Sequence, residues 1–251
     1  MDITKWIVAH FSPTGGTKKV ADAIAAGFAV PVVMLDLTKE VPAIALSQGE
    51  ALMAVLPVYA GRVPQIALER LSAINGRGHK AVAVVVYGNR EFDDGLLETK
   101  NALQMQGFTV IAGAAFIAEH SIVRSVATGR PDAEDEKIAR QFGADIMAKA
   151  EKAVPITVPG NEPYVALHTS PFHPVADESC VGCGLCAQNC PVGAIPQDAP
   201  NSTDNDICIN CLRCMQICPV GCRSLPESFL NFVTKLLDEN AKGYKKPAIF
   251  L

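Results

Sequence analysis

Nine cysteines carry the clearest chemical signal in this sequence of 251 residues, and all of them lie between Cys180 and Cys222. Eight form two runs of identical spacing, 28 residues apart: Cys180-x₂-Cys183-x₂-Cys186-x₃-Cys190-Pro191 and Cys208-x₂-Cys211-x₂-Cys214-x₃-Cys218-Pro219. A structural zinc site needs about four ligands and commonly draws them from two Cys-x₂-Cys pairs. Each run here adds a third close cysteine and a fourth before proline, so the spacing favours iron–sulfur clusters over zinc.

The odd number of cysteines argues against a closed set of disulfides. A reducing cytosol keeps thiols free, so dense cysteines in such a chain indicate metal binding. Cys222 aligns with Ala194 of the first run and is not needed as a ninth ligand. We interpret Cys222 as a small buried apolar residue, with a redox-sensing thiol as the alternative.

Residues 177–225 resemble a bacterial-type two-cluster 4Fe–4S ferredoxin over their full length. In such ferredoxins the fourth cysteine of each run serves the other cluster. The resemblance therefore implies that one cluster is held by Cys180, Cys183, Cys186 and Cys218. It implies that the second is held by Cys208, Cys211, Cys214 and Cys190.

The cysteine-free part of the chain alternates apolar runs of strand length with segments of helical character. The expected strands, near-continuous in apolar residues as in parallel sheets, are Trp6–His10, Val32–Asp36, Leu52–Val58, Ala81–Tyr87 and Val110–Ile117. The expected helices are Lys18–Phe28, Pro64–Ala73, Leu96–Gln106 and Asp132–Ala153, the last opening with an acidic first turn. This alternation predicts a doubly wound α/β sheet, which binds ligands at the carboxyl ends of its strands.

Three loops follow expected strands at that edge. The first is rich in hydroxyls and glycine and leads into a helix, so its backbone amides suit a phosphate. This loop consists of Ser12, Pro13, Thr14, Gly15, Gly16 and Thr17. Two others combine glycine with an aromatic residue that suits a planar ring, in the segments 57–64 and 87–95. Taken singly, these loops also fit helix capping or rim packing, but three of them would line one crevice.

Residues 1–153 resemble a flavodoxin, since Ser-x-Thr-Gly-x-Thr at positions 12–17 matches the flavodoxin loop that holds the FMN phosphate. The resemblance implies a doubly wound, five-stranded parallel sheet of order 2-1-3-4-5. A second, smaller α+β ferredoxin domain follows it along the chain. The resemblance places the flavin ring between two loops, Pro57, Val58, Tyr59, Ala60, Gly61 and Arg62 on one side and Gly88, Asn89, Arg90, Phe92 and Asp93 on the other. His10 and His120 lie near strand ends, where packing or a hydrogen bond at the rim is the expected role and contact with the flavin is the alternative.

Two segments remain. Residues 154–176 carry five prolines and are expected to form an extended linker, in which His168 and His173 would be solvated. Residues 226–251 contain apolar residues at helical spacing, which predict a helix docked on one of the domains or, alternatively, a helix that binds a partner: Phe229, Phe232, Val233, Leu236 and Leu237.

Composition limits the classes of function. Hydrophobic residues make up 49% and charged residues 19%, which argues against disorder, and the net charge of −4 argues against a nucleic-acid binder. The longest apolar stretches are about half of a membrane span, and the first residues lack the features of a secretory signal. We therefore expect a cytoplasmic protein that uses neither membrane nor nucleic acid.

The combined resemblance is to flavodoxin–ferredoxin fusion proteins of anaerobes. It implies an electron-transfer iron–sulfur flavoprotein that links one-electron carriers to two-electron chemistry. Its partners would be redox enzymes that use ferredoxin or flavodoxin, and a homodimer is compatible with this function. The alternative is an FMN-dependent reductase of a small molecule, fed by its own ferredoxin domain, with Tyr59, Arg62 and Arg90 around the substrate. No acid–base pair stands out, so we name no catalytic residue and leave open whether the protein is an enzyme.

Overall fold

Six strands form the central sheet of the computed structural model, which describes residues 2–150, 154–167 and 170–251. Five run parallel, in the spatial order β7 (Thr109–Ile117), β6 (Lys80–Tyr87), β4 (Glu50–Pro57), β1 (Lys5–His10) and β2 (Val32–Asp36). Numbered among themselves, these strands have the order 2-1-3-4-5, so the expected flavodoxin-like doubly wound fold is confirmed. β2 forms one edge and exposes Val33 and Met34, whereas the four other parallel strands are almost fully buried.

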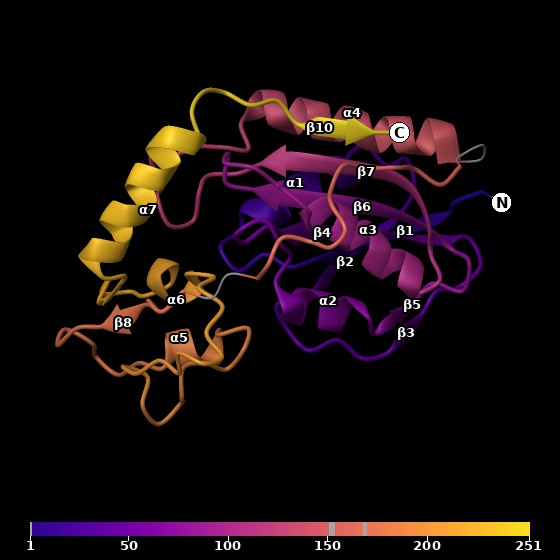
Figure 1. The fold of residues 1–251 in the computed structure, drawn as a ribbon. Coiled ribbons are helices and arrows are strands. Elements are labelled where there is room, and N and C mark those ends of the chain that lie inside the picture. Colours follow the sequence, from indigo (N-terminus) through magenta and orange to yellow (C-terminus); the bar gives the residue numbers. More distant parts are fainter. Residues whose placement is uncertain (1, 151–153, 168–169) are drawn as a thin grey trace.

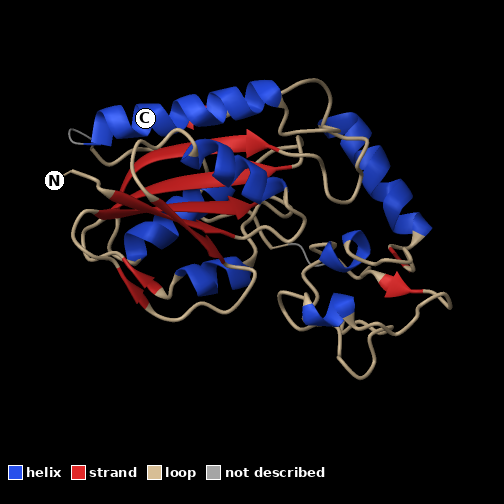
Figure 2. Ribbon diagram, turned by 180° about the vertical axis from the view of Figure 1, so that it is seen from behind, coloured by secondary structure: helices blue, strands red, loops and turns tan. Residues whose placement is uncertain are grey.

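Helices cover both faces of this sheet (Figure 2). α1 (Gly16–Ala25) and α4 (Ala133–Lys149) bury one face around Trp6 and Phe142. α2 (Gln65–Leu71) and α3 (Gly95–Met105) bury the other face around Leu71, Leu96 and Leu103. Along β1 the side chains alternate between the two cores, as the period of a strand requires.

Local chemistry explains where α4 begins and how closely it packs. The Asp132 carboxylate caps the first turn by accepting from the amides of Glu134 and Asp135 (both 3.0 Å). α1 and α4 approach so closely that a Cβ on Gly143 would lie 2.2 Å from the carbonyl oxygen of Ile24. The expected end of α4 at residue 153 falls outside the described residues.

The described part of the proline-rich segment, 154–167, contains no helix or strand but is not a free tether. The amide of Ile156 donates to the carbonyl of Val110 (3.2 Å), and side chains of Ile156 and Val158 pack over Gly113 of β7. The Asp94 carboxylate accepts from the amide of Asn161 (2.8 Å). These residues of the expected extended linker are therefore docked along the sheet edge and α3.

The cysteine-rich residues form a small lobe beside the sheet (Figure 1). It contains the one-turn helices α5 (Leu185–Gln188) and α6 (Arg213–Gln216) and an antiparallel pair, β8 (Val175–Ala176) with β9 (Arg223–Ser224). Arg223 is buried and donates to the carbonyls of Pro200 and Ser202, which holds the loop between the two cysteine runs. His173 is buried rather than solvated, and His168 lies outside the described residues.

Outside the cysteine-rich lobe, three described elements were not predicted from the sequence, namely β3 (Ile44–Ala45), β5 (Ile74–Asn75) and β10 (Ala248–Phe250). β3 and β5 form a separate two-stranded parallel sheet. The expected C-terminal helix is present as α7 (Glu227–Asn240), and its buried residues Val233 and Leu237 pack on Val123. Beyond it the chain returns to the sheet as β10, which pairs antiparallel with β7. The lobe is thus an insertion in the first domain, since the sheet contains strands from both sides of it (Figure 1).

Candidate cofactor sites

The eight repeated cysteines surround two cavities inside the lobe, four to each. The inner cavity, with about 340 Å³ of space that no protein atom fills, is lined by Cys190, Cys208, Cys211 and Cys214. The outer cavity, with about 310 Å³, is lined by Cys180, Cys183, Cys186 and Cys218. The fold therefore brings the fourth cysteine of each run to the first three of the other run, which is the grouping implied by the ferredoxin resemblance.

Matching turns build the two cavities from the repeated sequence. Three pairs of residues 28 positions apart share the left-handed backbone conformation: Gly182 and Asn210, Gly184 and Leu212, Gly193 and Gly221. Such a φ is uncommon outside glycine, so its recurrence at equivalent positions shows that both runs wrap their cavity in the same way. In the first run the amide of Ala194 also donates to Cys190 Sγ (3.3 Å).

Burial disfavours the charged form of the Cys211 and Cys214 thiols at the inner cavity. Burial raises the pKa of Cys211 to about 12 and that of Cys214 to about 11, and neighbouring thiolates add to both shifts. A bound metal reverses this preference, because its positive charge holds the ligands as thiolates. Four converging thiols per cavity therefore fit a cationic cluster. Within the described ranges, no three His, Cys, Asp or Glu side chains are placed to hold a single metal ion.

Cys222 is the fifth thiol at the outer cavity. Its side chain is buried, and its Sγ lies 3.4 Å from Cys218 Sγ. Ala194 occupies the equivalent position of the first run, so the inner cavity has four thiols only. The burial expected for Cys222 is confirmed, whereas a redox role stays a prediction.

The predicted phosphate loop joins β1 to α1 at the carboxyl edge of the sheet. Gly15, at φ +91°, is the N-cap of α1, and the amide of Lys18 donates to Ser12 Oγ (2.8 Å). Gly16 is packed so that a Cβ would lie 3.1 Å from the Cβ of Ala118, while Thr17 is buried. Pro13 is buried and Thr14 partly exposed, so the loop presents a backbone cradle at the start of a helix, where an anion is favoured.

The two predicted ring loops touch each other. The backbones of Tyr59 and Arg62 pair across a tight turn whose central residues, Ala60 and Gly61, both have positive φ, as a type I′ turn requires. A Cβ on Gly61 would lie 2.5 Å from Asp93 Oδ2, so only glycine lets this turn reach the second loop. Pro57, buried, and Val58, half-buried, lead from β4 into the turn.

Several side chains of these loops already have partners. Arg62 forms an ion pair with Glu98 (2.6 Å), and Arg90 pairs with Asp93. Phe92 packs edge-on against Tyr87, with ring centroids 5.6 Å apart. The guanidinium of Arg62, which the reductase alternative placed around a substrate, is therefore used to tie the first ring loop to α3.

Two buried polar atoms at this edge have no hydrogen-bond partner among the described residues. They are Nδ1 of His10, the last residue of β1, and Oδ1 of Asn89, in the loop that follows β6. Burial lowers the pKa of His10, so this imidazole is neutral at pH 7. Unpaired buried polar atoms are costly and usually mark a place where a ligand or water binds. Together with the phosphate cradle, they fit a polar, phosphate-bearing ligand.

The inner cavity is the one that faces these loops. Three side-chain hydrogen bonds cross from the flavodoxin-like domain to the lobe, namely Gln216 Nε2 to Thr14 O (3.2 Å), Arg70 Nη2 to Pro191 O (2.6 Å) and Arg213 Nη1 to Thr38 Oγ1 (3.3 Å). Burial raises the pKa of Tyr59 well above its ordinary value, and the charge of Cys211 adds to the shift. The lobe is thus docked on the flavodoxin-like domain through residues that line or adjoin the inner cavity, and one of these bonds reaches the phosphate loop.

Comparisons with known proteins find similarities to both parts of the chain. Residues 179–222 match the family described as a 4Fe-4S dicluster domain. Similar solved structures include a flavodoxin from the domain Archaea (22% identity over 59% of this chain and 99% of that one, TM-score 0.46) and oxidised flavodoxin 1 from Bacillus cereus (19%, 57% and 97%, 0.45). Another is the rubredoxin oxygen:oxidoreductase of the anaerobe Desulfovibrio gigas (15%, 60% and 37%, 0.43). A search of curated proteins gives no match.

The lobe is thus similar to a 4Fe–4S dicluster domain over residues 179–222, and the strand order of the remaining sheet is flavodoxin-like. Among the described residues, no helix has the length and apolar character needed to cross a membrane. The contacts of residues 241–245 with the second ring loop were not predicted from the sequence. The short apolar run Ala248-Ile249-Phe250 was the available signal for β10.

Proposed function

We propose that this chain is an electron-transfer protein that passes electrons between two 4Fe–4S clusters and FMN, and so links one-electron carriers to two-electron chemistry. The observation that carries this proposal is the docking of the inner cysteine cavity on the flavodoxin-like domain: Pro191 and Arg213, which line the cavity, bond to Arg70 and Thr38. Cys190, Cys208, Cys211 and Cys214 would hold one cluster, and Cys180, Cys183, Cys186 and Cys218 the other. When bound, FMN supplies a centre that accepts one or two electrons.

The loops at the carboxyl edge would bind FMN in two parts. The backbone amides of the phosphate loop and the hydroxyls of Ser12, Thr14 and Thr17 would hold the phosphate. The loops 57–62 and 88–93 would hold the ring. His10, neutral at pH 7, would add no positive charge next to the ligand.

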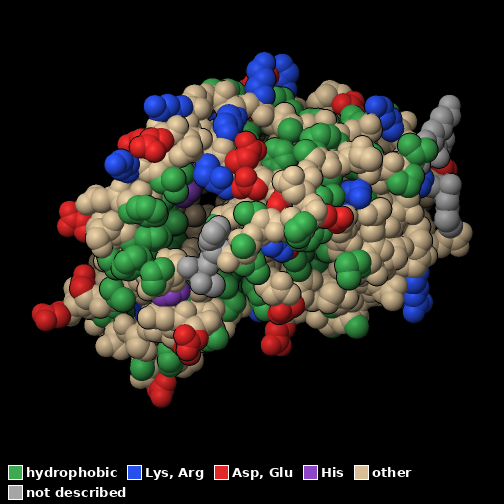
Figure 3. Space-filling view, in the orientation of Figure 1, with side chains coloured by type: hydrophobic (Ala, Val, Ile, Leu, Met, Phe, Trp, Pro, Cys, Tyr) green, Lys and Arg blue, Asp and Glu red, His purple; other side chains and the backbone are tan. Residues whose placement is uncertain are grey.

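The outer cavity is the natural place for exchange with a partner protein. Cys183 is exposed there, and so are the apolar side chains of Val181, Leu185 and Val220. Acidic side chains surround the lobe (Figure 3), and five of them are exposed: Asp177, Glu178, Asp198, Asp204 and Asp206. The two basic residues of the lobe, Arg213 and Arg223, are half-buried and buried. We infer a redox partner with a basic docking surface, because opposite charges steer such encounters.

Rapid mixing of the loaded, oxygen-free protein with a one-electron reductant tests the proposal. Bleaching of the cluster absorbance should be followed by reduction of FMN at a rate that does not depend on protein concentration. Cys211→Ser, which removes a ligand of the inner cavity, should abolish the second phase, whereas Cys183→Ser at the outer cavity should leave inner-cavity iron able to reduce FMN. A second-phase rate that rises linearly with protein concentration would mean transfer between chains and would refute the internal route.

A further inference from the structure

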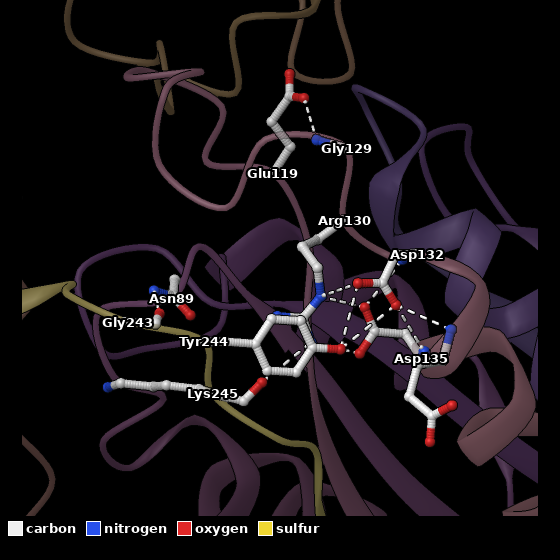
Figure 4. A network of polar contacts seen from close by, with 10 residues as sticks. Asn89, Glu119, Gly129, Arg130, Asp132, Asp135, Gly243, Tyr244 and Lys245 are labelled. Atoms are coloured by element: carbon white, nitrogen blue, oxygen red, sulfur yellow. Dashed lines mark hydrogen bonds and ion pairs between the residues drawn. The ribbon is translucent and has the colours of Figure 1, made fainter.

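The segment that joins α7 to β10, residues 241–247, crosses the second ring loop before it reaches the sheet edge (Figure 4). We call these residues the clasp. Asn89, Arg90 and Glu91 of the ring loop face it from one side, and Arg130 faces it from the other. The clasp therefore connects two loops that follow neighbouring strands, β6 and β7.

The amide of Asn89 makes the central contact. Its Nδ2 donates to the carbonyl oxygens of Ala241 (2.7 Å) and Gly243 (3.0 Å). Both partners are acceptors, so the NH₂ group must face the clasp. Asn89 is 3% exposed and has a left-handed backbone (φ 64°), a conformation that Asn and Asp tolerate better than most residues. The residue thus fixes the bend of the ring loop and ties that bend to the clasp.

Lys245 makes the second contact with the same loop. Its ammonium donates to the carbonyl of Arg90 and lies 3.7 Å from the Glu91 carboxylate. On the other side of the clasp, the Tyr244 ring lies over the guanidinium of Arg130, 4.0 Å from ring centroid to Cζ. Arg130 is buried, pairs with Asp135 and donates to the carbonyl of Lys245 (3.1 Å). The clasp is therefore anchored on α4 while it holds the ring loop.

We propose that the clasp is part of the flavin site, with Asn89 and Lys245 as positioning residues that hold the loop 88–93 in the conformation that receives the flavin ring. The inference rests on the proposed function. It assigns the clasp to the ring alone, because no hydrogen bond or ion pair of the clasp within the described ranges reaches the phosphate loop. Loss of these contacts should thus weaken FMN and riboflavin by the same factor, since both carry the ring.

Asn89→Asp in the full chain tests the inference. The variant keeps the size of the side chain and its tolerance for the left-handed backbone, but it places a carboxylate against two carbonyl oxygens. We expect both FMN and riboflavin to bind about tenfold more weakly or worse, with a changed visible circular dichroism of the bound flavin. Asn240→Asp is the matched control, because it makes the same change at an exposed residue whose amide bonds only within α7 (to Leu236 O, 2.8 Å). The control should bind both flavins as wild type does.

Lys245→Met provides a second variant that removes one contact from a partly exposed side chain. It should weaken both flavins by about threefold, which corresponds to the low end of the net contribution of one hydrogen bond and suits a partly exposed donor. Unchanged affinity and circular dichroism in both Asn89→Asp and Lys245→Met would overturn the inference. Loss of FMN affinity with riboflavin unaffected would also overturn it, since the clasp would then act on the phosphate. Failure of the wild-type protein to bind either flavin would instead refute the proposed function.

Discussion

Mild acid should destabilise the flavodoxin-like domain through one histidine, His120. Its Nδ1 accepts the backbone N–H groups of Ile122 (3.2 Å) and Val123 (3.1 Å), and its ring packs on Gly88, where a Cβ would lie 2.4 Å from Cδ2. Protonation of Nδ1 would break both hydrogen bonds. Burial lowers the pKa of His120 to about 4, and the charge of Arg90 acts in the same direction.

The sign and size of the effect follow from proton linkage. The unfolded chain takes up the proton near the ordinary pKa of about 6.5, whereas the folded protein resists protonation until the pH approaches 4. Stability is therefore complete above pH 6.5 and falls as the pH decreases from there towards 4. At pH 5 the loss from this residue is about 2 kcal/mol, from about 1.4 kcal/mol per pH unit. That is a large share of the 5–15 kcal/mol typical of a folded protein.

Urea unfolding at pH 7, 6 and 5, followed by tryptophan fluorescence, measures this loss. The single tryptophan, Trp6, is fully buried in the first domain and stacks on Phe28 (4.6 Å between ring centroids), so its emission reports this domain. His120→Asn keeps an acceptor for the two amides but does not titrate. Burial also lowers the pKa of His10, so the quantity to compare is the difference between wild type and variant. If both lose the same stability between pH 7 and pH 5, the reasoning about His120 is wrong.

Two further predictions concern the cofactors. Thr14→Ala combined with Thr17→Ala should weaken FMN far more than riboflavin in a titration, since only FMN carries the phosphate, and equal losses would place the phosphate elsewhere. Cys190→Ala should remove iron mainly from the inner cavity. Cys218→Ala should cost less iron at the outer cavity, because Cys222 Sγ lies 3.4 Å from Cys218 Sγ and Ala194 offers no such replacement. Iron and sulfide analysis measures the loss, and the loaded wild-type chain should contain about eight of each. An equal loss of iron in Cys190→Ala and Cys218→Ala would contradict a replacement of Cys218 by Cys222.

Most strands of the sheet could be predicted from the sequence, because the local hydrophobic pattern decides where buried strands form. The strands β1, β2, β4, β6 and β7 appear within two residues of their predicted ends, and the turn chemistry at Asp132 marked the start of α4. The cysteine spacing was equally informative, since three close thiols and a distant fourth restrict the chain geometry on their own. The strand order came from the flavodoxin resemblance rather than from the pattern.

The remaining features depend on contacts between residues far apart in the chain, which local pattern does not encode. The docking of 154–167 is fixed by Asp94, whose carboxylate resembled an ordinary helix cap in the sequence. Asn89 was predicted to line the flavin ring, but its side-chain amide donates to two carbonyl oxygens more than 150 positions away in the sequence. β10 has only three residues, which is too short for a periodicity to be visible. These are the places where tertiary structure, rather than propensity, determines the outcome.

The position of β10 also affects how the protein is made. A ribosome completes the five parallel strands, then the whole cysteine-rich lobe, and delivers β10 last. Until then the outer side of β7 near Gly113 lacks its antiparallel partner, and an open strand edge is a template for pairing with other chains. Synthesis of the lobe thus comes before closure of the sheet. Until β10 has been made, the open edge is a place where chaperones and proteases can recognise an unfinished protein.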